Sequence, residues 1–444
     1  MGSHTAITKV LVANRGEIAV RVIRSVHEMG MQAVAVYSEA DQCAPHVRLA
    51  DQAICLGAAE VTASYLSVEH LLEAAKESGA DAIHPGYGLL SESASFADAV
   101  QAAGLVWIGP PSDAMRAMAS KTEARKTMVS AGVPVVPGGS ISESAKVGYP
   151  LLVKASAGGG GKGMRRVDTA NELQDAIDTC SREAEKSFGD GTVYLEHLVE
   201  RPRHIEIQVF ADSHGNTVHL FERECSVQRR HQKVVEESPS SAVSADLRER
   251  MGAAAVSAAE AVNYVGAGTV EFLLNENGDY YFLEMNTRLQ VEHPVTELVT
   301  GVDLVAEQIR VAQGHPLSFT QELLAQHGHA IECRIYAEDP ASQLPQVGVI
   351  QTLKIPEGVG IRHDSGIYQG WEVGVYYDPM LAKLCVWAET RDAAIERMKH
   401  ALSEYVLLGC VSNIPLLQHI VSHNEFKTGN TTTAFLEDYP FTAD

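Results

Sequence analysis

Residues 268–286 impose the strongest local constraint on the fold, because an Asn277-Gly278 pair separates two stretches in which apolar and polar residues alternate. Asn-Gly between such stretches predicts a β-hairpin with a type I′ turn. In that register Glu271 lies directly opposite Glu284. Directly paired side chains share one face of a sheet, with Cβ atoms about 4.5–5.5 Å apart. Two carboxylates so placed repel unless a proton or a cation lies between them, so we expect a divalent metal ion there.

The polar face of this hairpin extends beyond its second strand. If the extended conformation continues, Asn286, Arg288, Gln290 and Glu292 lie on the same face. The predicted opposite face is apolar: Val270, Phe272, Leu274, Tyr281, Leu283 and Met285. A solvated strand face is the alternative interpretation. The apolar opposite face and the mixture of carboxylates, amides and a guanidinium favour a metal–phosphate site, since Mg²⁺ binds one or two carboxylates plus substrate phosphates.

The bulk composition is that of a large globular protein. Its 444 residues, 45% of them hydrophobic, suffice for more than one domain. The net charge of −22 argues against nucleic acid or an anionic membrane as a general partner. The seven cysteines contain no Cys-x-x-Cys pair, so neither a zinc site nor a disulfide framework is indicated. No apolar run has the length of a membrane span and no secretory leader pattern is present, so we expect a cytoplasmic protein.

Strand-like and helix-like patterns alternate along the first 110 residues. The strand-like stretches are residues 9–13, 32–37, 80–84 and 106–108, and the helix-like stretches are residues 17–29, 68–77 and 92–103. This alternation predicts an α/β unit with an open parallel sheet, helices on both faces, and ligands at the carboxyl ends of the strands. From residue 204 onward the pattern is that of an antiparallel sheet with hairpins and helices, giving an α+β character overall.

A glycine-rich loop lies between two further predicted strands, residues 151–154 and 164–167. Residues 158–163 match G-x-G-x-x-G, but a dinucleotide fingerprint leads into a helix, and the Walker A pattern fails because Gly163 follows Lys162. We interpret the loop as a closing lid whose backbone N–H groups bind phosphate oxygens. A merely flexible loop is the alternative, which Lys154 ahead of it disfavours. A capping box at residues 169–172 predicts the start of a helix that runs to about residue 186.

Six short motifs, in this order, resemble the ATP-grasp family and, within it, the biotin carboxylases. They are Val12-Ala13-Asn14-Arg15-Gly16-Glu17-Ile18-Ala19, His84-Pro85-Gly86-Tyr87-Gly88, Lys154-Ala155-Ser156-Ala157-Gly158, Gln228-Arg229-Arg230-His231-Gln232-Lys233, Glu284-Met285-Asn286-Thr287-Arg288 and Gln290-Val291-Glu292-His293-Pro294. The combination of Arg-Arg-His-Gln-Lys with Glu332-Cys333-Arg334 is the most specific part of this resemblance. Several details are most similar to the biotin carboxylase part of acyl-CoA carboxylase α subunits, including Lys186-Ser187-Phe188 and Arg334-Ile335-Tyr336.

The resemblance implies an ATP-grasp fold in four parts. These are an N-terminal Rossmann-like domain at residues 1–115, a helical linker at 116–134, a small αβ lid domain at 135–200, and a C-terminal domain with mixed and antiparallel sheets at 201–444. The C-terminal domain would carry the metal, bicarbonate and biotin sites.

The resemblance also implies a set of ligand-binding residues. ATP would be held by Lys121, Lys154, Gly160, Gly161, Glu196, Val199, His204, Gln228, His231 and Leu273. Magnesium or manganese would be held by Glu271, Glu284 and Asn286, which agrees with the hairpin prediction. Bicarbonate would be surrounded by Lys233, Arg288, Gln290, Val291, Glu292 and Arg334, while Tyr87 and Arg334 would lie near biotin.

The implied catalytic residues are Glu292, Arg288, Lys233 and Arg334. Glu292 would remove the proton of bicarbonate as the γ-phosphoryl group transfers, giving carboxyphosphate. The metal, Lys154 and the lid would offset charge on the phosphates. Arg334 would stabilise the enolate-like oxygen of biotin.

The implied partners are a biotin carboxyl carrier protein or domain and a carboxyltransferase subunit. The chain contains no Ala-Met-Lys-Met biotinylation site, so biotin would arrive on another protein or region. Arg24 and Glu28 occupy positions that resemble contacts of a homodimer. Two alternatives remain open on the residues alone: another ATP-grasp ligase that uses an acyl phosphate, such as half of a carbamoyl phosphate synthetase, and a non-catalytic nucleotide-sensing subunit.

Overall fold

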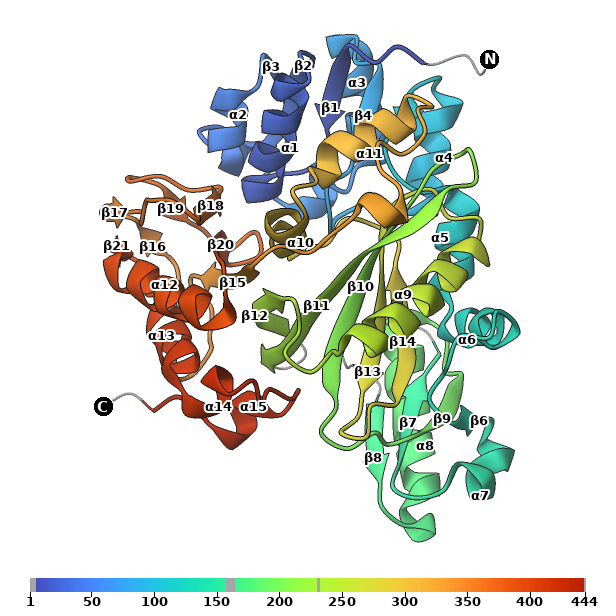
Figure 1. Ribbon diagram of the computed structural model, residues 1–444. Coiled ribbons are helices and arrows are strands. Elements are labelled where there is room, and N and C mark those ends of the chain that lie inside the picture. Colours follow the sequence, from blue (N-terminus) through green and yellow to red (C-terminus); the bar gives the residue numbers. More distant parts are fainter. Residues whose placement is uncertain (1–4, 157–163, 230–231, 443–444) are drawn as a thin grey trace.

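The N-terminal part is an open parallel sheet with helices on both faces (Figure 1). The computed structural model describes residues 5–156, 164–229 and 232–442. The sheet has the order β3-β2-β1-β4-β5, built from β1 (Lys9–Val12), β2 (Gln32–Ser38), β3 (Gln52–Gly57), β4 (Ala82–His84) and β5 (Val106–Trp107). Its helices are α1 (Gly16–Glu28), α2 (Pro45–Leu49), α3 (Val68–Ser78) and α4 (Ala94–Ala102).

Alternate residues of β1 pack against helices on opposite sides of this sheet. Val10 and Val12 pack against α1, and Leu11 packs with the residues of α3 and α4. The predicted parallel sheet is therefore confirmed. The sequence patterns did not reveal β3 or α2, because β3 is an edge strand whose side chains are mostly half-buried and alternate weakly.

A small four-stranded antiparallel sheet follows two linking helices, α5 (Ser112–Ala119) and α6 (Lys121–Ser130). Its order is β6-β9-β7-β8, formed by β6 (Gly138–Gly139), β7 (Leu151–Ala155), β8 (Met164–Val167) and β9 (Val193–His197), with helices α7 (Ser144–Val147) and α8 (Leu173–Phe188). The two strands predicted around the glycine loop are present, whereas the loop, residues 157–163, lies outside the described residues.

The predicted capping box before α8 is wrong. The Thr169 side chain makes no capping hydrogen bond, and a 3₁₀ turn, Ala170–Glu172, precedes the helix. The Glu172 carboxylate instead accepts a hydrogen bond from the backbone N–H of Asp168 at 3.1 Å. In a capping box Glu172 would accept from the backbone N–H of Thr169, not from that of Asp168. The regular helix begins only at Leu173.

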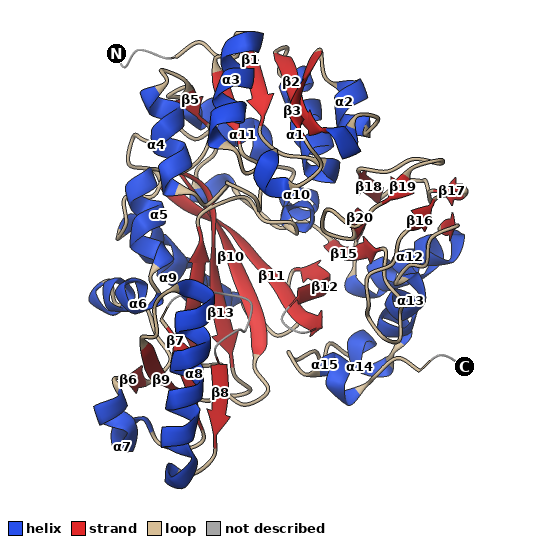
Figure 2. Cartoon of the chain, turned by 180° about the vertical axis from the view of Figure 1, so that it is seen from behind, coloured by secondary structure: helices blue, strands red, loops and turns tan. Residues whose placement is uncertain are grey.

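An eight-stranded antiparallel sheet forms the centre of the molecule, and its long strands are visible from behind in Figure 2. Its order is β14-β13-β10-β11-β12-β15-β20-β18. The strands are β10 (Arg203–Ala211), β11 (Thr217–Arg229), β12 (Gln232–Ser238), β13 (Gly266–Leu274), β14 (Tyr280–Asn286), β15 (His329–Tyr336), β18 (Ile361–Ser365) and β20 (Met380–Ala388).

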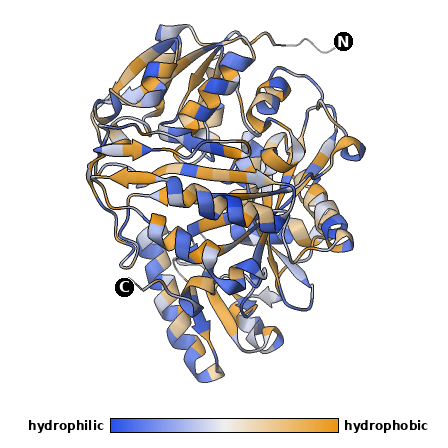
Figure 3. Ribbon diagram, turned by 60° about the vertical axis from the view of Figure 1, so that its left-hand side comes forward, coloured by the Kyte–Doolittle hydropathy of each residue, from blue (hydrophilic) through white to orange (hydrophobic). Residues whose placement is uncertain are grey.

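Helices cover the apolar face of this sheet in two places. Helix α9 (Ala245–Glu260) packs over β10 and β13, and α12 (Arg391–Glu404) with α13 (Ile414–Ser422) packs over β15 and β20. Figure 3 shows the strands as largely hydrophobic, while the helices have a hydrophobic and a hydrophilic side.

The remaining α-helices and strands are α10 (His293–Thr300), α11 (Leu304–Ala312), α14 (Asn424–Lys427), α15 (Phe435–Asp438), β16 (Gly348–Val349), β17 (Thr352–Lys354), β19 (Glu372–Val373) and β21 (Val406–Leu408). Among the described residues no helix is both long and apolar enough to cross a membrane.

The predicted pairing of Glu271 with Glu284 is confirmed, but the predicted type I′ turn is wrong. The pairs nearest the turn are offset by one residue, so that Leu274 faces Tyr280 rather than Tyr281. The loop is longer than two residues, and Asn275 Oδ1 accepts hydrogen bonds from the backbone N–H groups of Asn277 and Asp279. Among the described residues of this loop, only Gly278 has a positive φ, of 83°.

A bulge in β14 corrects the offset. Phe272 faces Phe282 whereas Glu271 faces Glu284, so Leu283 is the extra residue. The predicted apolar face is therefore partly wrong. Tyr280 and Phe282 contribute to the core in place of Tyr281 and Leu283. Leu283 instead lines the cavity described below.

Candidate active site

One cavity of about 1210 Å³ collects the residues that the sequence singled out. Its lining residues come from the carboxyl end of the N-terminal sheet, the four-stranded sheet and the polar face of the eight-stranded sheet. The predicted residues that line it are Tyr87, Lys121, Lys154, Glu196, Val199, His204, Gln228, Lys233, Glu271, Leu273, Glu284, Asn286, Arg288, Gln290, Val291, Glu292 and Arg334. The predicted Gly160, Gly161 and His231 lie outside the described residues.

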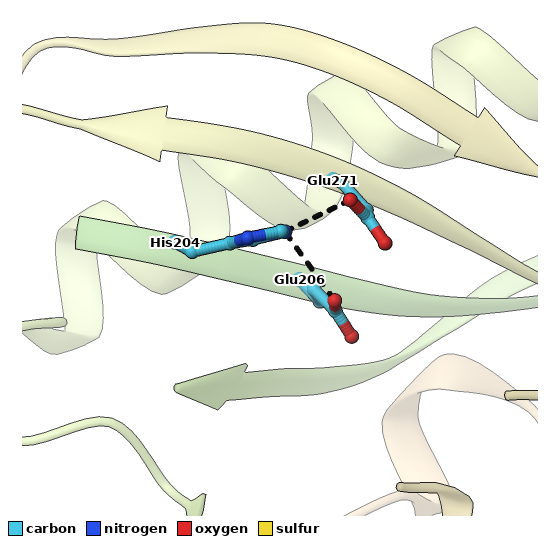
Figure 4. Close-up of side chains that lie close together, drawn as sticks. All are labelled: His204, Glu206 and Glu271. Carbon is cyan, nitrogen blue, oxygen red and sulfur yellow. Dashed lines mark ion pairs between the residues drawn. The ribbon is translucent and has the colours of Figure 1, made fainter. Parts of the chain in front are cut away.

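Glu271 is the most heavily contacted acid of the cavity. One of its carboxylate oxygens accepts hydrogen bonds from Lys233 Nζ at 3.0 Å, Asn286 Nδ2 at 2.7 Å and Gln290 Nε2 at 2.8 Å. The other oxygen lies 2.9 Å from His204 Nε2, and Figure 4 draws this ion pair as a dashed line. Burial alone would raise the pKa of Glu271, but the attraction of Lys233 and His204 outweighs it and holds the pKa well below its ordinary value. Glu271 is therefore an anion.

His204 is held by the same acid. Burial opposes its protonation, but the attraction of Glu271 outweighs burial and raises the pKa of His204. Its Nδ1 lies 2.7 Å from Gln228 Nε2, and the Gln228 amide also donates to the backbone carbonyl of Cys225 at 2.8 Å. These contacts hold the His204 ring between Gln228 of β11 and Glu271 of β13, so two residues predicted to bind ATP, His204 and Gln228, are in direct contact with each other.

Glu206 belongs to this cluster although the sequence analysis did not select it. It pairs with Glu271 across β10 and β13, accepts a hydrogen bond from Arg223 at 3.1 Å and forms an ion pair with Lys233. Burial raises the pKa of Glu206 to about 8, an effect that Lys233 opposes and that neighbouring acids strengthen. The alternation of residues 204–209 places Glu206 on the face of His204, and this signal could have identified it.

Glu292 is a buried carboxylate held between two cations. One of its oxygens accepts from Lys233 Nζ at 2.7 Å and the other from Arg334 at 2.9 Å. Burial would raise its pKa, but Lys233 and Arg334 outweigh burial and hold the pKa of Glu292 well below its ordinary value. Arg334 Nε also donates to Glu236 at 2.6 Å. The sequence did not point to Glu236, because β12, which carries it, pairs with the distant strand β15. Glu292 is therefore available as a proton acceptor.

Glu284 has the opposite electrostatic environment to its cross-strand partner. Burial and the charge of Glu271 raise the pKa of Glu284, while Lys121 opposes the shift. Burial lowers the pKa of Lys121. The Asn286 side chain bridges the pair to Arg288, donating to Glu271 and accepting from Arg288 at 2.9 Å. Two facing carboxylates and an amide oxygen are hard donors of the kind that Mg²⁺ and Mn²⁺ prefer, so these residues fit a divalent metal ion.

The remaining predicted cations anchor the rim of the cavity. Lys154 of β7 forms an ion pair with Glu196 of β9. Arg288 donates to Glu92 at 2.9 Å, which joins the segment after β14 to the turn before α4. Glu92 was also missed, because no local pattern links residues so far apart in the sequence. The cavity thus combines cations suited to phosphates, an ionised carboxylate at Glu292 and acids that fit a divalent metal ion.

Known proteins match the chain along almost its whole length. The family described as "Biotin carboxylase, N-terminal domain" matches residues 6–115, and "Biotin carboxylase C-terminal domain" matches residues 332–438. Between them, residues 120–320 match "Carbamoyl-phosphate synthase L chain, ATP binding domain". The flanking matches place this ATP-binding segment in a biotin carboxylase rather than in a carbamoyl phosphate synthetase.

Individual relatives agree with the family matches. Biotin carboxylase 2 of Bacillus subtilis is 50% identical over 97% of this chain and 99% of its own length. The mitochondrial methylcrotonoyl-CoA carboxylase subunit alpha of Dictyostelium discoideum is 51% identical over 97% of this chain, which spans 63% of that subunit. A biotin carboxylase crystal structure from Campylobacter jejuni superposes with a TM-score of 0.95 at 44% identity, covering 98% of this chain and 99% of that one.

A further structure shows ligands of the expected kind in a relative. The biotin carboxylase domain dimer of Hydrogenobacter thermophilus 2-oxoglutarate carboxylase, in complex with MgADP, ADP and bicarbonate, has a TM-score of 0.95 at 45% identity, covering 99% of this chain and 100% of that chain. Fold and site together are those of an ATP-grasp ligase. The chain belongs to the biotin carboxylase family of ATP-dependent ligases.

Proposed function

We propose that Glu292 is the base in an ATP-dependent carboxylation of biotin by bicarbonate, the first half-reaction of a biotin-dependent carboxylase. The observation that carries this proposal is the position of the Glu292 carboxylate, buried and ionised between Lys233 and Arg334. An ionised acid in hydrogen-bond reach of a bound anion's O–H can take its proton. The two neighbouring cations attract that anion, which offsets its repulsion by Glu292.

The first step forms carboxyphosphate. As Glu292 takes the bicarbonate proton, the freed oxygen attacks the γ-phosphorus of ATP and ADP leaves. Glu271, Glu284 and Asn286 would hold Mg²⁺ or Mn²⁺, which supplies charge neutralisation to the phosphate oxygens. Lys121 and Lys154 lie at the same end of the cavity and would contact those phosphates. Lys233 and Arg288 would orient bicarbonate.

The second step transfers carbon dioxide to biotin. Carboxyphosphate separates into CO₂ and phosphate, and the phosphate removes the proton from the ureido nitrogen of biotin. That nitrogen attacks CO₂ while the Arg334 guanidinium stabilises the negative charge on the ureido oxygen. Tyr87 lies at the edge of the same cavity and would contact biotin. Because carboxyphosphate hydrolyses in water, the burial of Glu292 and Arg334 is chemically useful.

The proposal includes a carrier protein or domain that brings biotin, a carboxyltransferase subunit that receives the carboxyl group, and a cytoplasmic location. The Dictyostelium relative, named as a subunit of a larger carboxylase, supports the carrier and the carboxyltransferase.

We also propose a homodimer. Arg24 and Glu28 are exposed on one side of α1, Arg24 lines a second cavity of about 480 Å³ with Leu49 and His363, and the Hydrogenobacter structure is a dimer. We further propose domain limits at residues 115, 134 and 200. The limit at residue 115 is supported by the end of the N-terminal family match at that residue.

The test is release of ADP by the purified chain with MgATP and bicarbonate, with and without free biotin. We expect turnover that requires bicarbonate and rises with biotin. Turnover that is indifferent to biotin, or that requires ammonia, would reject the proposed function.

A further inference from the structure

Lys383 holds the backbone of the segment that carries Glu292. It lies on β20, opposite Arg334 of β15, and is completely buried. Its Nζ donates a hydrogen bond to the backbone carbonyl oxygen of Val291 at 2.8 Å. That carbonyl belongs to the peptide bond between Val291 and Glu292. Since Arg334 binds the Glu292 carboxylate, two paired residues of neighbouring strands hold Glu292 at its backbone and at its side chain.

The same ammonium group meets segments that are far apart in the sequence. It lies 3.3 Å from Glu17 in the first turn of α1 and 3.9 Å from Asp364 of β18. It also lies 5.7 Å from the centre of the Tyr87 ring. Neither carboxylate oxygen of Glu17 has a hydrogen-bond partner among the described residues. The hydrogen bond to Val291 is therefore the directional contact of Lys383, whereas the neighbouring acids Glu17, Glu332 and Asp364 attract its charge.

We propose that Lys383 is a positioning residue for the carboxylation reaction, because its hydrogen bond to Val291 sets the peptide plane from which Glu292 reaches bicarbonate. The segment from Gln290 to Glu292 has no strand partners and lies between the end of β14 and the start of α10. Backbone hydrogen bonds from His293 N–H to the Gln290 carbonyl and from Val295 N–H to the Glu292 carbonyl, both 3.3 Å, tie its two ends to the start of α10. The Val291 carbonyl between them accepts from Lys383. A base must stay within hydrogen-bond reach of the proton it takes, so a small displacement lowers the rate. This inference rests on the proposed role of Glu292.

The main test is Lys383→Met, which keeps the length of the side chain and removes the donor. We expect kcat/KM for bicarbonate to fall about 10- to 100-fold. The Kd for ATP, measured by calorimetry, should change by less than about twofold, because Lys383 contacts none of the residues assigned to ATP. The matched control is Lys399→Met, which removes a lysine of α12 whose only ion-pair partner among the described residues is Glu396, one turn away, and which should leave both quantities unchanged. An unchanged kcat/KM in Lys383→Met, or an equal loss of ATP affinity, would overturn the proposal.

Glu17→Gln separates the hydrogen bond from the ion pair and tests the proposal even if Lys383→Met does not fold. Burial raises the pKa of Glu17 to about 7 against the opposing attraction of Lys383, so glutamine resembles a form that is populated at neutral pH. The variant keeps the Lys383 donor, and we expect kcat/KM for bicarbonate within about threefold of wild type. A tenfold or larger loss would show that the ion pair, rather than the contact with Val291, governs Glu292. Wild-type turnover that ignores biotin would reject the proposed function instead.

Discussion

Two buried histidines beside the parallel sheet and three charged side chains on the polar face of the antiparallel sheet are kept from water in different ways. Around the parallel sheet, His46 and His84 are completely buried, and burial lowers the pKa of each to about 4, so both are neutral. On the polar face of the antiparallel sheet, Glu271 and Glu292 are buried and Lys233 is largely shielded from water, yet all three remain ions. Burial is costly for a charge in both places; among the described residues neither histidine forms an ion pair, whereas Glu271, Glu292 and Lys233 contact opposite charges.

This contrast separates structural burial from a working site. A neutral buried histidine has one N–H to donate, and the carbonyl of Val36 accepts it from His46 Nε2 at 3.2 Å. On the antiparallel sheet, the single ammonium group of Lys233 instead forms ion pairs with three acids, Glu206, Glu271 and Glu292. Such an arrangement is poor evidence for stability, since apolar residues of equal size would pack at lower cost. It is better explained by the need to hold anions and a base in a cavity.

The largest expected effect is that of Glu292→Gln. The change removes the proton acceptor while keeping shape and some hydrogen bonding, so bicarbonate-dependent ADP release should fall about 10³-fold. ATP binding by calorimetry should be preserved. Glu276→Gln, on the exposed hairpin loop, is the matched control and should be fully active. Normal turnover of Glu292→Gln would remove Glu292 as the base.

Arg334→Ala should have the next largest effect. Loss of the guanidinium removes stabilisation of the ureido oxygen, so carboxylation of free biotin should fall about 100-fold. The slow ATPase activity without biotin should fall less, because it does not require that charge. Both rates are measured on the same preparation. Equal losses in the two activities would contradict the division of roles between Arg334 and Glu292.

A smaller effect concerns stability around the parallel sheet. The folded pKa of His46 is about 4 and the ordinary value is 6.5, so between these pH values the unfolded chain binds a proton that the folded chain does not. Stability is therefore full above pH 6.5 and falls as the pH is lowered, by about 2 kcal/mol at pH 5. In His46→Gln, the loss of unfolding free energy between pH 7.5 and pH 5 should shrink by that amount. His400→Gln, at an exposed site, should leave it unchanged; the same pH dependence in both variants would contradict the assignment.

The smallest expected effect tests the shape of the hairpin loop. Gly278 has a φ of 83° and open space around its Cβ position, so Gly278→Ala should cost about 1–2 kcal/mol of unfolding free energy through backbone strain alone. Asn277 is not in that conformation, and Asn277→Ala should cost less than about 0.5 kcal/mol. Urea unfolding measures both. Equal costs would favour the type I′ turn that the sequence alone predicts.

Local patterns predicted part of the fold and the facing acids of the site. Asn277-Gly278 located the hairpin, and the facing of Glu271 and Glu284 is as predicted, although a longer loop and a bulge at Leu283 cancel each other to produce it. The bulge depends on how Phe282 packs in the core, which no local pattern contains. Glu206 could have been found from strand alternation.

The rest of the site depends on contacts between distant segments. Glu236 reaches Arg334 only because β12 pairs with β15, and Lys383 reaches Val291 only because β20 packs beside the start of α10. Residue patterns specify each strand but not its neighbours, so these partners became visible only in the folded chain. The roles of Arg334 and Tyr87 were implied by family resemblance rather than by any pattern.

Transfer of label from ¹⁴C-bicarbonate to free biotin is the most direct test of the proposed chemistry. With MgATP, the wild-type chain should form acid-labile labelled carboxybiotin in proportion to the ADP released, and Glu292→Gln should form almost none. ATP hydrolysis by the wild-type chain without any label in biotin, or undiminished labelling by Glu292→Gln, would contradict it.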